Sequence, residues 1–373
     1  MKKILFFCSF PPPNTGQTVG TKLTFEYVNE FIGAADKINI VDKNRLSRNS
    51  GVFSFYQLFN IIPKFYKLFS KIKSNNYNSI YVVYSSTKLA LIRDAIYTYI
   101  IKKFSKARII AQLHSGDYGN NFRTGIYKAI FSWLMKKVDV LIFSSKLVNN
   151  INNNINASKI VYMANMISPE LICTNEEIAD KIKKKENDHT LSIYYISNMI
   201  KEKGYLDVTY AAAELKKKCP SQSFVLHLIG GWPSDDNQKE FKAGLSEMGL
   251  DDNVIIYGAI NEREKLKNFF LNADVFVLPT YYPIEAQPFS IIEALNAATP
   301  VISTYHASIP ELVQNDYNGY LIKPKDITNL CNSLIKLIDK KNWTKLSTNA
   351  RESYLNNYDR EIIGPKLKTI FSN

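Results

Sequence analysis

Two glutamates, Glu285 and Glu293, stand eight residues apart on either side of Pro288. Proline has no N–H group and holds the residue before it in an extended conformation, so Pro288 predicts a helix that begins near Phe289. The open backbone amides of a first helical turn, together with the positive end of the helix dipole, form a site for a diphosphate. Glu293 shares one helix face with Phe289 and Ser290. The pattern therefore indicates an anion site flanked by two carboxylates.

Carboxylates repel phosphate but accept hydrogen bonds from hydroxyl groups. Glu285 and Glu293 would thus hold the two sugars at either end of a nucleoside diphosphate sugar. In the simpler alternative, Glu293 only neutralises the dipole of its own helix and Glu285 is an exposed loop acid. Taken by themselves, the two glutamates fit that alternative better.

Short apolar runs bounded by polar or turn residues recur along the chain and predict buried parallel strands. In the first half these runs are KILFFCS, INIVD, SIYVVYS, RIIAQLH, VDVLIFSS and KIVYMAN, and in the second half LSIYYIS, FVLHLIG, NVIIYGA, VFVLPT and PVIST. Helical patterns lie between several of them, at Thr21 to Gly33, Lys88 to Phe104, Gly125 to Lys137, Tyr205 to Lys218, Glu240 to Gly249, Glu262 to Asn272 and Phe289 to Ala298. This alternation predicts an α/β protein with two Rossmann-like, doubly wound domains.

A chain of 373 residues is long enough for two domains. We expect an N-terminal domain over residues 1–170, a charged linker or short helix over 171–190, and a second domain over 191–354. A C-terminal helix at about 355–373 could pack back onto the first domain. Two α/β domains that face each other create a cleft, which is a favoured place for ligands.

Positive charge is concentrated in the first domain. Residues 1–170 contain 23 Lys and Arg against 8 Asp and Glu, a net charge of +15, whereas the remainder has 24 against 26, a net charge of −2. Such a domain attracts polyanions such as an anionic lipid leaflet or nucleic acid. Aromatic and leucine residues alternate with lysines from Val52 to Lys73, which favours an amphipathic helix in a membrane interface. The alternatives are a core-packing helix with a basic outer face and, for the charge, a solvated lysine-rich surface.

Other features narrow the class of protein. The four cysteines are widely scattered and stand in no ligand spacing with the four histidines, so neither a zinc site nor a disulfide framework is indicated. The apolar stretch Ile4 to Phe10 is short and leads into three prolines, which favours a buried strand over a signal peptide. No apolar run reaches the roughly 18–20 residues that span a bilayer. We expect a cytoplasmic protein that is soluble or peripheral at the inner membrane face.

Several segments carry a family resemblance. The segment Thr280 to Thr304, TYYPIEAQPFSIIEALNAATPVIST, resembles the E-x7-E region of retaining GT-B glycosyltransferases, glycosyltransferase family four in particular. SNMIKEKG, which ends at Gly204, resembles that family's G-R-L-x-x-E-K-G turn. The resemblance implies that Lys203 neutralises the donor phosphates and that Asn198 replaces the usual arginine. SIPELVQNDYNGYLI is similar to the family's closing loop and strand, except that Ala307 and Ser308 stand where glycines are usual.

The N-terminal half carries looser resemblances. PPPNTGQTVGTK is similar to the family's proline-and-glycine loop and implies that Gly16 approaches the donor phosphates. QLHSGD places His114 directly after a strand, as in the family's acceptor-side histidine, although a lone histidine is as often structural. VYMANMI resembles the end of the family's first domain and places Asn165 at the hinge.

The resemblance implies a GT-B fold, two domains facing across a cleft, and transfer with retention of anomeric configuration. Glu285, Lys203 and His114 would be the catalytic residues, with Glu285 on the sugar hydroxyls and Glu293 on the ribose. The donor-binding residues would be Gly16, Asn198, Lys203, Glu285, Pro288, Phe289, Ser290 and Glu293. The chain contains no D-x-D, the metal-binding pair of the other large glycosyltransferase fold, so the reaction is expected to need neither metal nor cofactor.

We therefore expect an enzyme that moves a hexose or N-acetylhexosamine from a nucleotide diphosphate sugar, such as a UDP-sugar, to a glycan or lipid-linked sugar acceptor. The resemblance favours a role in bacterial surface polysaccharide or glycolipid synthesis. Alternatives with the same architecture are a nucleotide-sugar epimerase, a sugar phosphorylase and a non-catalytic partner subunit that binds the nucleotide sugar. A nucleic-acid binder is disfavoured because no recognisable binding motif accompanies the positive charge.

Overall fold

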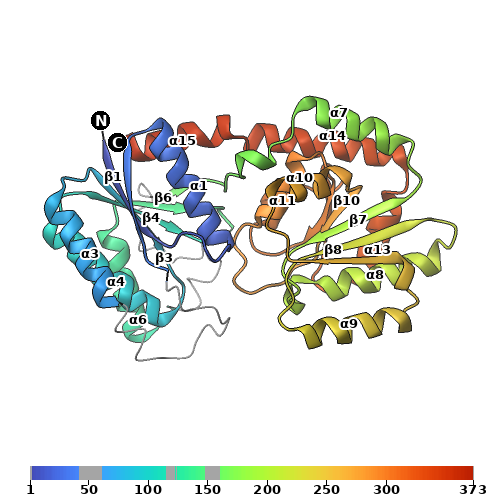
Figure 1. The fold of residues 1–373 in the computed structure, drawn as a ribbon, viewed down its shortest axis with the longest axis horizontal. Coiled ribbons are helices and arrows are strands. Elements are labelled where there is room, and N and C mark those ends of the chain that lie inside the picture. Colours follow the sequence, from blue (N-terminus) through green and yellow to red (C-terminus); the bar gives the residue numbers. More distant parts are fainter. Residues whose placement is uncertain (1, 42–60, 115–121, 123, 148–159, 373) are drawn as a thin grey trace. The chain divides into compact units, whose positions relative to one another are not determined.

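The computed structural model describes residues 2–41, 61–114, 122, 124–147 and 160–372 (Figure 1). The chain forms two compact units. Unit 1 consists of Met1–Met166 and Arg360–Asn373, and unit 2 of Ile167–Asp359. The sequence of unit 2 is thus inserted into that of unit 1.

Within the described residues, unit 1 contains a sheet of six parallel strands in the order β2-β1-β3-β4-β5-β6. The strands are β1 (Lys3–Cys8), β2 (Ala34–Asn39), β3 (Ser79–Tyr84), β4 (Arg108–Leu113), β5 (Val140–Phe143) and β6 (Ile160–Tyr162). The central strands are buried along nearly their whole length, as their continuous apolar runs predict. The edge strand β2 begins earlier than the predicted INIVD run. Its side chains, apart from Ile38, lie at least partly in solvent, so no apolar run marks its start in the sequence.

Two helical layers cover this sheet. The helices are α1 (Gly16–Phe31), α3 (Ile61–Ser74), α4 (Lys88–Phe104), α6 (Gly125–Lys137) and α15 (Arg360–Ser372). Residues of α3, α4 and α6 pack into one apolar cluster on one face of the sheet, whereas α1 and α15 pack into a second cluster on the other face. The predicted helix Val52 to Lys73 corresponds in part to α3, and its first nine residues lie outside the described part of the chain.

The helix α1 begins five residues before the predicted Thr21. Thr15 caps it: the Thr15 Oγ1 accepts a hydrogen bond from the Thr18 backbone N–H at 3.2 Å, and the Thr18 side chain accepts one from the Thr15 N–H at 2.9 Å. This reciprocal capping box satisfies two backbone N–H groups and lets the helix extend through glycine at its start.

The helix α15 completes the core of unit 1 from the far end of the chain. The ring of Phe371 lies 6.0 Å from Phe6 and 6.1 Å from Tyr81, centroid to centroid. A Cβ atom on Gly364 would come within 2.0 Å of the Tyr27 hydroxyl, so a larger residue there would require the Tyr27 side chain to move. These contacts show that residues 360–372 belong to the apolar core of unit 1.

Unit 2 also contains a sheet of six parallel strands among the described residues, in the order β12-β11-β10-β7-β8-β9. The strands are β7 (Leu191–Ile196), β8 (Phe224–Ile229), β9 (Val254–Gly258), β10 (Val275–Leu278), β11 (Val301–Thr304) and β12 (Gly319–Ile322). Its α-helices are α7 (Asn175–Glu186), α8 (Tyr205–Lys218), α9 (Asp235–Glu247), α10 (Arg263–Asn272), α11 (Phe289–Asn296), α12 (Ile309–Leu312), α13 (Ile327–Lys336) and α14 (Lys340–Asn357). The short 3-10 helices are η2 (Pro169–Leu171), η3 (Lys201–Lys203) and η4 (Asp251–Asn253).

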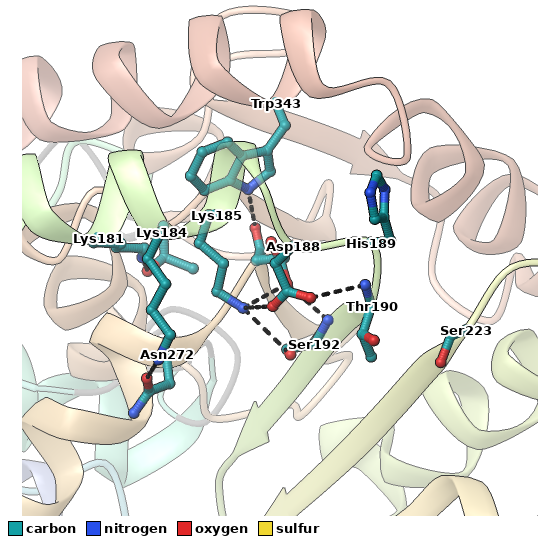
Figure 2. Close-up of polar contacts among 12 residues, drawn as sticks. Lys181, Lys184, Lys185, Asp188, His189, Thr190, Ser192, Ser223, Asn272 and Trp343 are labelled. Carbon is teal, nitrogen blue, oxygen red and sulfur yellow. Dashed lines mark hydrogen bonds and ion pairs between the residues drawn. The ribbon is translucent and has the colours of Figure 1, made fainter.

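Of the two alternatives for 171–190, a linker and a short helix, the structure shows the helix: α7 lies in this segment and belongs to unit 2 (Figure 2). Lys181 and Lys185 of α7 are buried. The Lys185 ammonium lies 2.8 Å from the buried Asp274 carboxylate, and Trp343 donates its indole N–H to the Asp274 carbonyl oxygen at 2.8 Å. A charged sequence normally indicates a solvated segment, but these lysines enter the interior because acceptors there satisfy their charges.

Of the helices that the structure describes, none is both long enough and apolar enough to cross a bilayer.

Candidate active site

The predicted residues of unit 2 gather at the carboxyl ends of β7 and β10, which are neighbouring parallel strands. Lys203 follows β7, and Glu285 lies in the loop after β10. The Lys203 Nζ contacts the Glu285 Oε2 at 2.5 Å, and the Thr280 hydroxyl donates to the same oxygen at 3.4 Å. Both charged side chains are largely buried. The parallel topology therefore joins two residues that are 82 positions apart in sequence.

The turn that carries Lys203 is fixed against the loop of Glu285. The Tyr281 backbone N–H donates to the Glu202 carbonyl oxygen at 2.8 Å. Gly204 ends the turn with φ at 85°, and a Cβ atom there would lie 2.6 Å from the Pro279 carbonyl oxygen. Glycine is required on both counts, since other residues rarely adopt this φ and would clash with the backbone. The Lys203 ammonium also lies 4.8 Å from the centre of the Tyr282 ring.

The helix α11 begins at Phe289, directly after Pro288, as predicted. Its N-cap residue, Pro288, makes no side-chain capping hydrogen bond, and Phe289 and Ser290 are only partly buried. The capped N-terminus of α1 provides a contrast, since Thr15 there already occupies a backbone donor. An uncapped helix N-terminus retains backbone N–H groups and the positive end of the dipole for an anion.

Glu293 lies one turn into α11. Its carboxyl group forms no hydrogen bond with any other described residue. Burial raises the pKa of its carboxyl group to about 7, and the positive charge of Arg263 partly opposes this shift. The carboxyl group therefore titrates near neutral pH and can either accept or donate a hydrogen bond to a hydroxyl group.

The C-terminal end of α11 is held by buried donors that sequence patterns did not reveal. Three consecutive carbonyl oxygens each accept from a side chain: that of Asn296 from Arg351 at 2.6 Å, that of Ala297 from Lys181 at 2.7 Å, and that of Ala298 from Ser347 at 2.7 Å. Lys181 also donates to the Phe270 carbonyl oxygen at 3.0 Å, at the end of α10. Cations at helix C-termini neutralise the negative end of the dipole.

The sequence contains a signal for the lysine contacts of this arrangement. Ile178, Lys181 and Lys185 repeat at the helical spacing of a buried face. Two lysines on such a face indicate acceptors in the interior. The Arg351 and Ser347 contacts have no comparable signal, because they depend on how α14 packs.

Asn198 and the closing loop complete the site end of unit 2. Asn198 follows β7 and is exposed, and its neutral amide supplies no positive charge at this position. His306 contacts the Tyr282 carbonyl oxygen through its Nε2 at 2.8 Å, which fixes the closing loop to the loop of Glu285. Ala307 adopts φ of 49°, the left-handed conformation that glycine favours, whereas Ser308 has ordinary helical dihedrals. The glycine-like backbone is thus retained at Ala307 without glycine.

The remaining predicted residues lie in unit 1. Gly16 is exposed and is the first residue of α1. His114 follows β4, and its Nε2 is buried with no hydrogen-bond partner among the described residues. Burial lowers the pKa of His114 to about 4, so its imidazole is neutral at pH 7. Asn165 is buried, next to the last residue of the first segment of unit 1.

Metal-ligand clusters of three or more His, Cys, Asp or Glu side chains are absent from the described ranges.

Comparison with known proteins identifies the domain that carries this site. The family model of the glycosyl transferases group 1 matches residues 175–353, which is most of unit 2. The chain is 25% identical over 186 residues to WcaL of Escherichia coli K12, named for glycosyl transfer in colanic acid biosynthesis, and the match covers 48% of this chain and 44% of WcaL. It is 29% identical over 126 residues to an Escherichia coli UDP-Gal:alpha-D-GlcNAc-diphosphoundecaprenol alpha-1,3-galactosyltransferase, covering 34% of this chain and 31% of that protein. The chain thus matches less than half the length of these curated relatives.

The fold is shared over the whole chain with solved structures. HepE of Anabaena, solved in complex with UDP-glucose, superposes with a TM-score of 0.73 at 19% identity and covers 100% of both chains. Solved GT-B glycosyltransferases therefore have the same architecture of two parallel six-stranded sheets with flanking helices. Residues 175–353 thus match the glycosyl transferases group 1 family, and the fold of the chain is GT-B.

Proposed function

We propose that this protein is a retaining, metal-independent glycosyltransferase that moves a hexose or N-acetylhexosamine from a nucleotide diphosphate sugar to a glycan or lipid-linked sugar acceptor. The observation that carries the proposal is the site of unit 2, which combines the N-terminus of α11, preceded by Pro288 without a side-chain cap bond, with the largely buried Lys203 and the carboxyl groups of Glu285 and Glu293. A diphosphate needs the first two groups, and the hydroxyls of its two sugars need the others.

The proposed donor contacts follow from the chemistry of each group. The diphosphate binds at the first turn of α11, after Pro288, and near the Lys203 ammonium. Glu285 holds hydroxyls of the transferred sugar, and Glu293 holds the ribose. Without donor, Lys203 and Glu285 neutralise each other in a largely buried place. The donor phosphates would share Lys203 with Glu285 and so keep both charges compensated as negative charge develops on the leaving group.

Retention requires the acceptor hydroxyl to attack from the face that the diphosphate leaves. The leaving phosphate then accepts the proton of that hydroxyl, so no protein base is needed on this face. His114, neutral at pH 7, would contribute a hydrogen bond on the acceptor side rather than positive charge. Catalysis would then depend on positioning and on charge stabilisation by Lys203 and α11.

The acceptor and setting are proposed from the relatives. Their names refer to colanic acid biosynthesis and to a diphosphoundecaprenol acceptor, which supports bacterial surface polysaccharide or glycolipid synthesis and a uridine donor. A site at the cytoplasmic membrane face would suit a lipid-linked acceptor. Two alternatives keep the same fold: a nucleotide-sugar epimerase, and a non-catalytic subunit that binds the nucleotide sugar.

Donor binding and turnover can be tested separately. Thermal shifts with UDP, GDP and their sugars identify the donor, because a ligand that binds only the folded state stabilises it. Transfer to lipid-linked acceptors is then compared for Lys203→Ala, Glu285→Ala and the control Lys201→Ala, an exposed lysine on the same turn. We expect about a hundredfold loss or more for the first two variants and little change for the control. Equal transfer rates in all three would refute the assigned roles.

The product distinguishes the alternatives. Retention predicts that the new linkage has the anomeric configuration of the donor by NMR, and metal independence predicts that EDTA leaves the rate unchanged. Conversion of the nucleotide sugar in the absence of any acceptor would indicate an epimerase. Donor stabilisation without turnover on any acceptor would indicate the non-catalytic subunit.

A further inference from the structure

The outer face of α4 in unit 1 is apolar, although it faces solvent. Its exposed apolar residues are Leu89, Ile92, Ile96 and Tyr99, with exposed fractions of 47%, 39%, 42% and 52%. These four residues, here called the α4 stripe, fall with Lys88 and Lys103 within an arc of about 100° around the helix axis. Single exposed apolar residues are ordinary on protein surfaces, but a continuous stripe over three turns marks an interaction surface.

The helical layer around the α4 stripe is strongly basic. The helix α4 contacts both α3 and α6. Together the three helices contain eleven lysines and arginines and one acidic residue, Asp94, which is buried and paired with Arg93 at 2.7 Å. Exposed lysines without an ion pair among the described residues are Lys67, Lys73, Lys88, Lys103, Lys128, Lys136 and Lys137. The stripe therefore lies within a field of uncompensated positive charge.

The lysines at the two ends of the stripe lie against aromatic rings. Lys88 lies 5.2 Å from the ring centre of Tyr127 on α6, and Lys103 lies 5.5 Å from that of Tyr99. Long lysine stems can follow an apolar surface while the ammonium group remains at its polar edge. Apolar side chains between such lysines match the cross-section of a lipid interface, in which acyl chains lie beneath charged headgroups.

We propose that the α3, α4 and α6 layer of unit 1 binds an anionic lipid bilayer surface, with the α4 stripe inserted at the interface and the lysines contacting anionic headgroups. Charge complementarity favours this partner over a second copy of the chain, because two such layers would repel each other. The surface is separate from the donor site in unit 2, so the inference does not rest on the proposed transfer activity.

The structure moves the centre of this surface away from the segment that the sequence indicated. The described part of that segment, α3, does expose Ile62 and Tyr66, with exposed fractions of 63% and 70%. However, its residues Leu68 and Ile72 are buried in the core of unit 1, so α3 cannot enter a bilayer by itself. The α4 stripe, which reads in sequence as part of a buried helix, supplies the longer continuous apolar face.

Vesicle flotation of the full chain tests the proposal. The vesicles are phosphatidylcholine alone or an equimolar mixture with phosphatidylglycerol, each at low and high salt. The variant Ile92→Ser/Ile96→Ser is compared with Ile255→Ser/Leu355→Ser, which removes two residues of similar exposure, 44% and 41%, from unit 2. Thermal unfolding and size-exclusion chromatography with light scattering accompany each protein.

We expect the unmodified chain and the unit 2 variant to float with anionic vesicles, less so at high salt because the charges are screened. The stripe variant should bind about tenfold less or weaker still while it unfolds at the same temperature. Absence of binding to either vesicle, or equal binding by the stripe variant, would overturn the proposal. A dimer that only the stripe variant converts to monomer, without vesicle binding, would instead assign the stripe to a second copy.

Discussion

The two units are built on sheets of the same type but use basic side chains in opposite ways. In unit 2, Lys181 and Lys185 are buried: Lys181 donates to a carbonyl oxygen at the end of α11, and Lys185 pairs with Asp274. Unit 1 instead directs most lysines of α3, α4 and α6 to its outer surface. The net charge of a domain therefore does not reveal whether its cations support its own interior or face an external partner.

The largest effect on stability is expected from the buried side of this comparison. The substitution Lys181→Met keeps most of the side-chain volume but removes the ammonium donor that the Ala297 and Phe270 carbonyl oxygens and the Thr299 hydroxyl share. We expect a loss of about 2–4 kcal/mol in unfolding free energy. Donor affinity should also fall, because α11 loses a contact that fixes it.

Denaturant unfolding and titration with the nucleotide donor measure the two effects. The control is Lys184→Met on the same helix, whose side chain is exposed. If both variants lost equal stability, the buried position of Lys181 would not explain its contribution, and the comparison between the two units would fail.

An intermediate effect is expected from Glu293 and His114, two of the groups whose pKa is shifted by burial. The pKa of Glu293 is raised from 4.5 to about 7, so its contribution to stability is present below the unfolded value and is lost as the pH rises toward 7. His114 behaves oppositely: its pKa is lowered from 6.5 to about 4, so its contribution is present above 6.5 and is lost as the pH falls toward 4.

Thermal unfolding over this pH range separates the two groups. The variant Glu293→Gln should remove the loss of stability that accompanies the rise from about pH 4.5 to about pH 7. His114→Gln should reduce the opposite slope at acidic pH, and the part that remains belongs to His227, whose pKa burial also lowers to about 4. An unchanged pH profile in Glu293→Gln would show that its carboxyl group titrates normally and is well solvated.

The smallest effect is expected on the exposed side. Replacing Lys128 and Lys136 of α6 with alanine removes no ion pair among the described residues and should change the unfolding free energy by less than about 0.5 kcal/mol. The same variant should weaken binding to anionic vesicles. A large loss of stability would mean that these lysines support unit 1 itself, and the contrast with unit 2 would fail.

The sequence predicted much of this architecture because periodicity and turn residues act locally. The strands around Ile4 and Ile193 and the start of α11 after Pro288 follow from short-range patterns. The fold class was confirmed on this basis. The roles assigned to Lys203, Glu285 and Glu293 stay predictions, although the structure brings Lys203 and Glu285 into contact.

What the sequence did not predict depends on tertiary packing. The sequence left the charged segment of α7 open between a linker and a short helix, because lysine is usually solvated. The carbonyl oxygens that accept from the buried Lys181 lie at the ends of α10 and α11. The sequence also did not predict that the α4 stripe is exposed, because apolar residues are usually buried. Its apolar residues resemble those of a core helix, and only the packing shows that Leu91 faces the sheet while Ile92 does not.

The return of the chain to unit 1 through α15 has a consequence for biosynthesis. Phe6 and Tyr81 emerge early from the ribosome, yet the ring of Phe371 that covers them is made last. All of unit 2 is synthesised between these residues. Unit 2 can therefore finish folding while one face of the unit 1 sheet still lacks α15. A nascent chain stalled before residue 360 should therefore recruit chaperones through the first domain that left the tunnel.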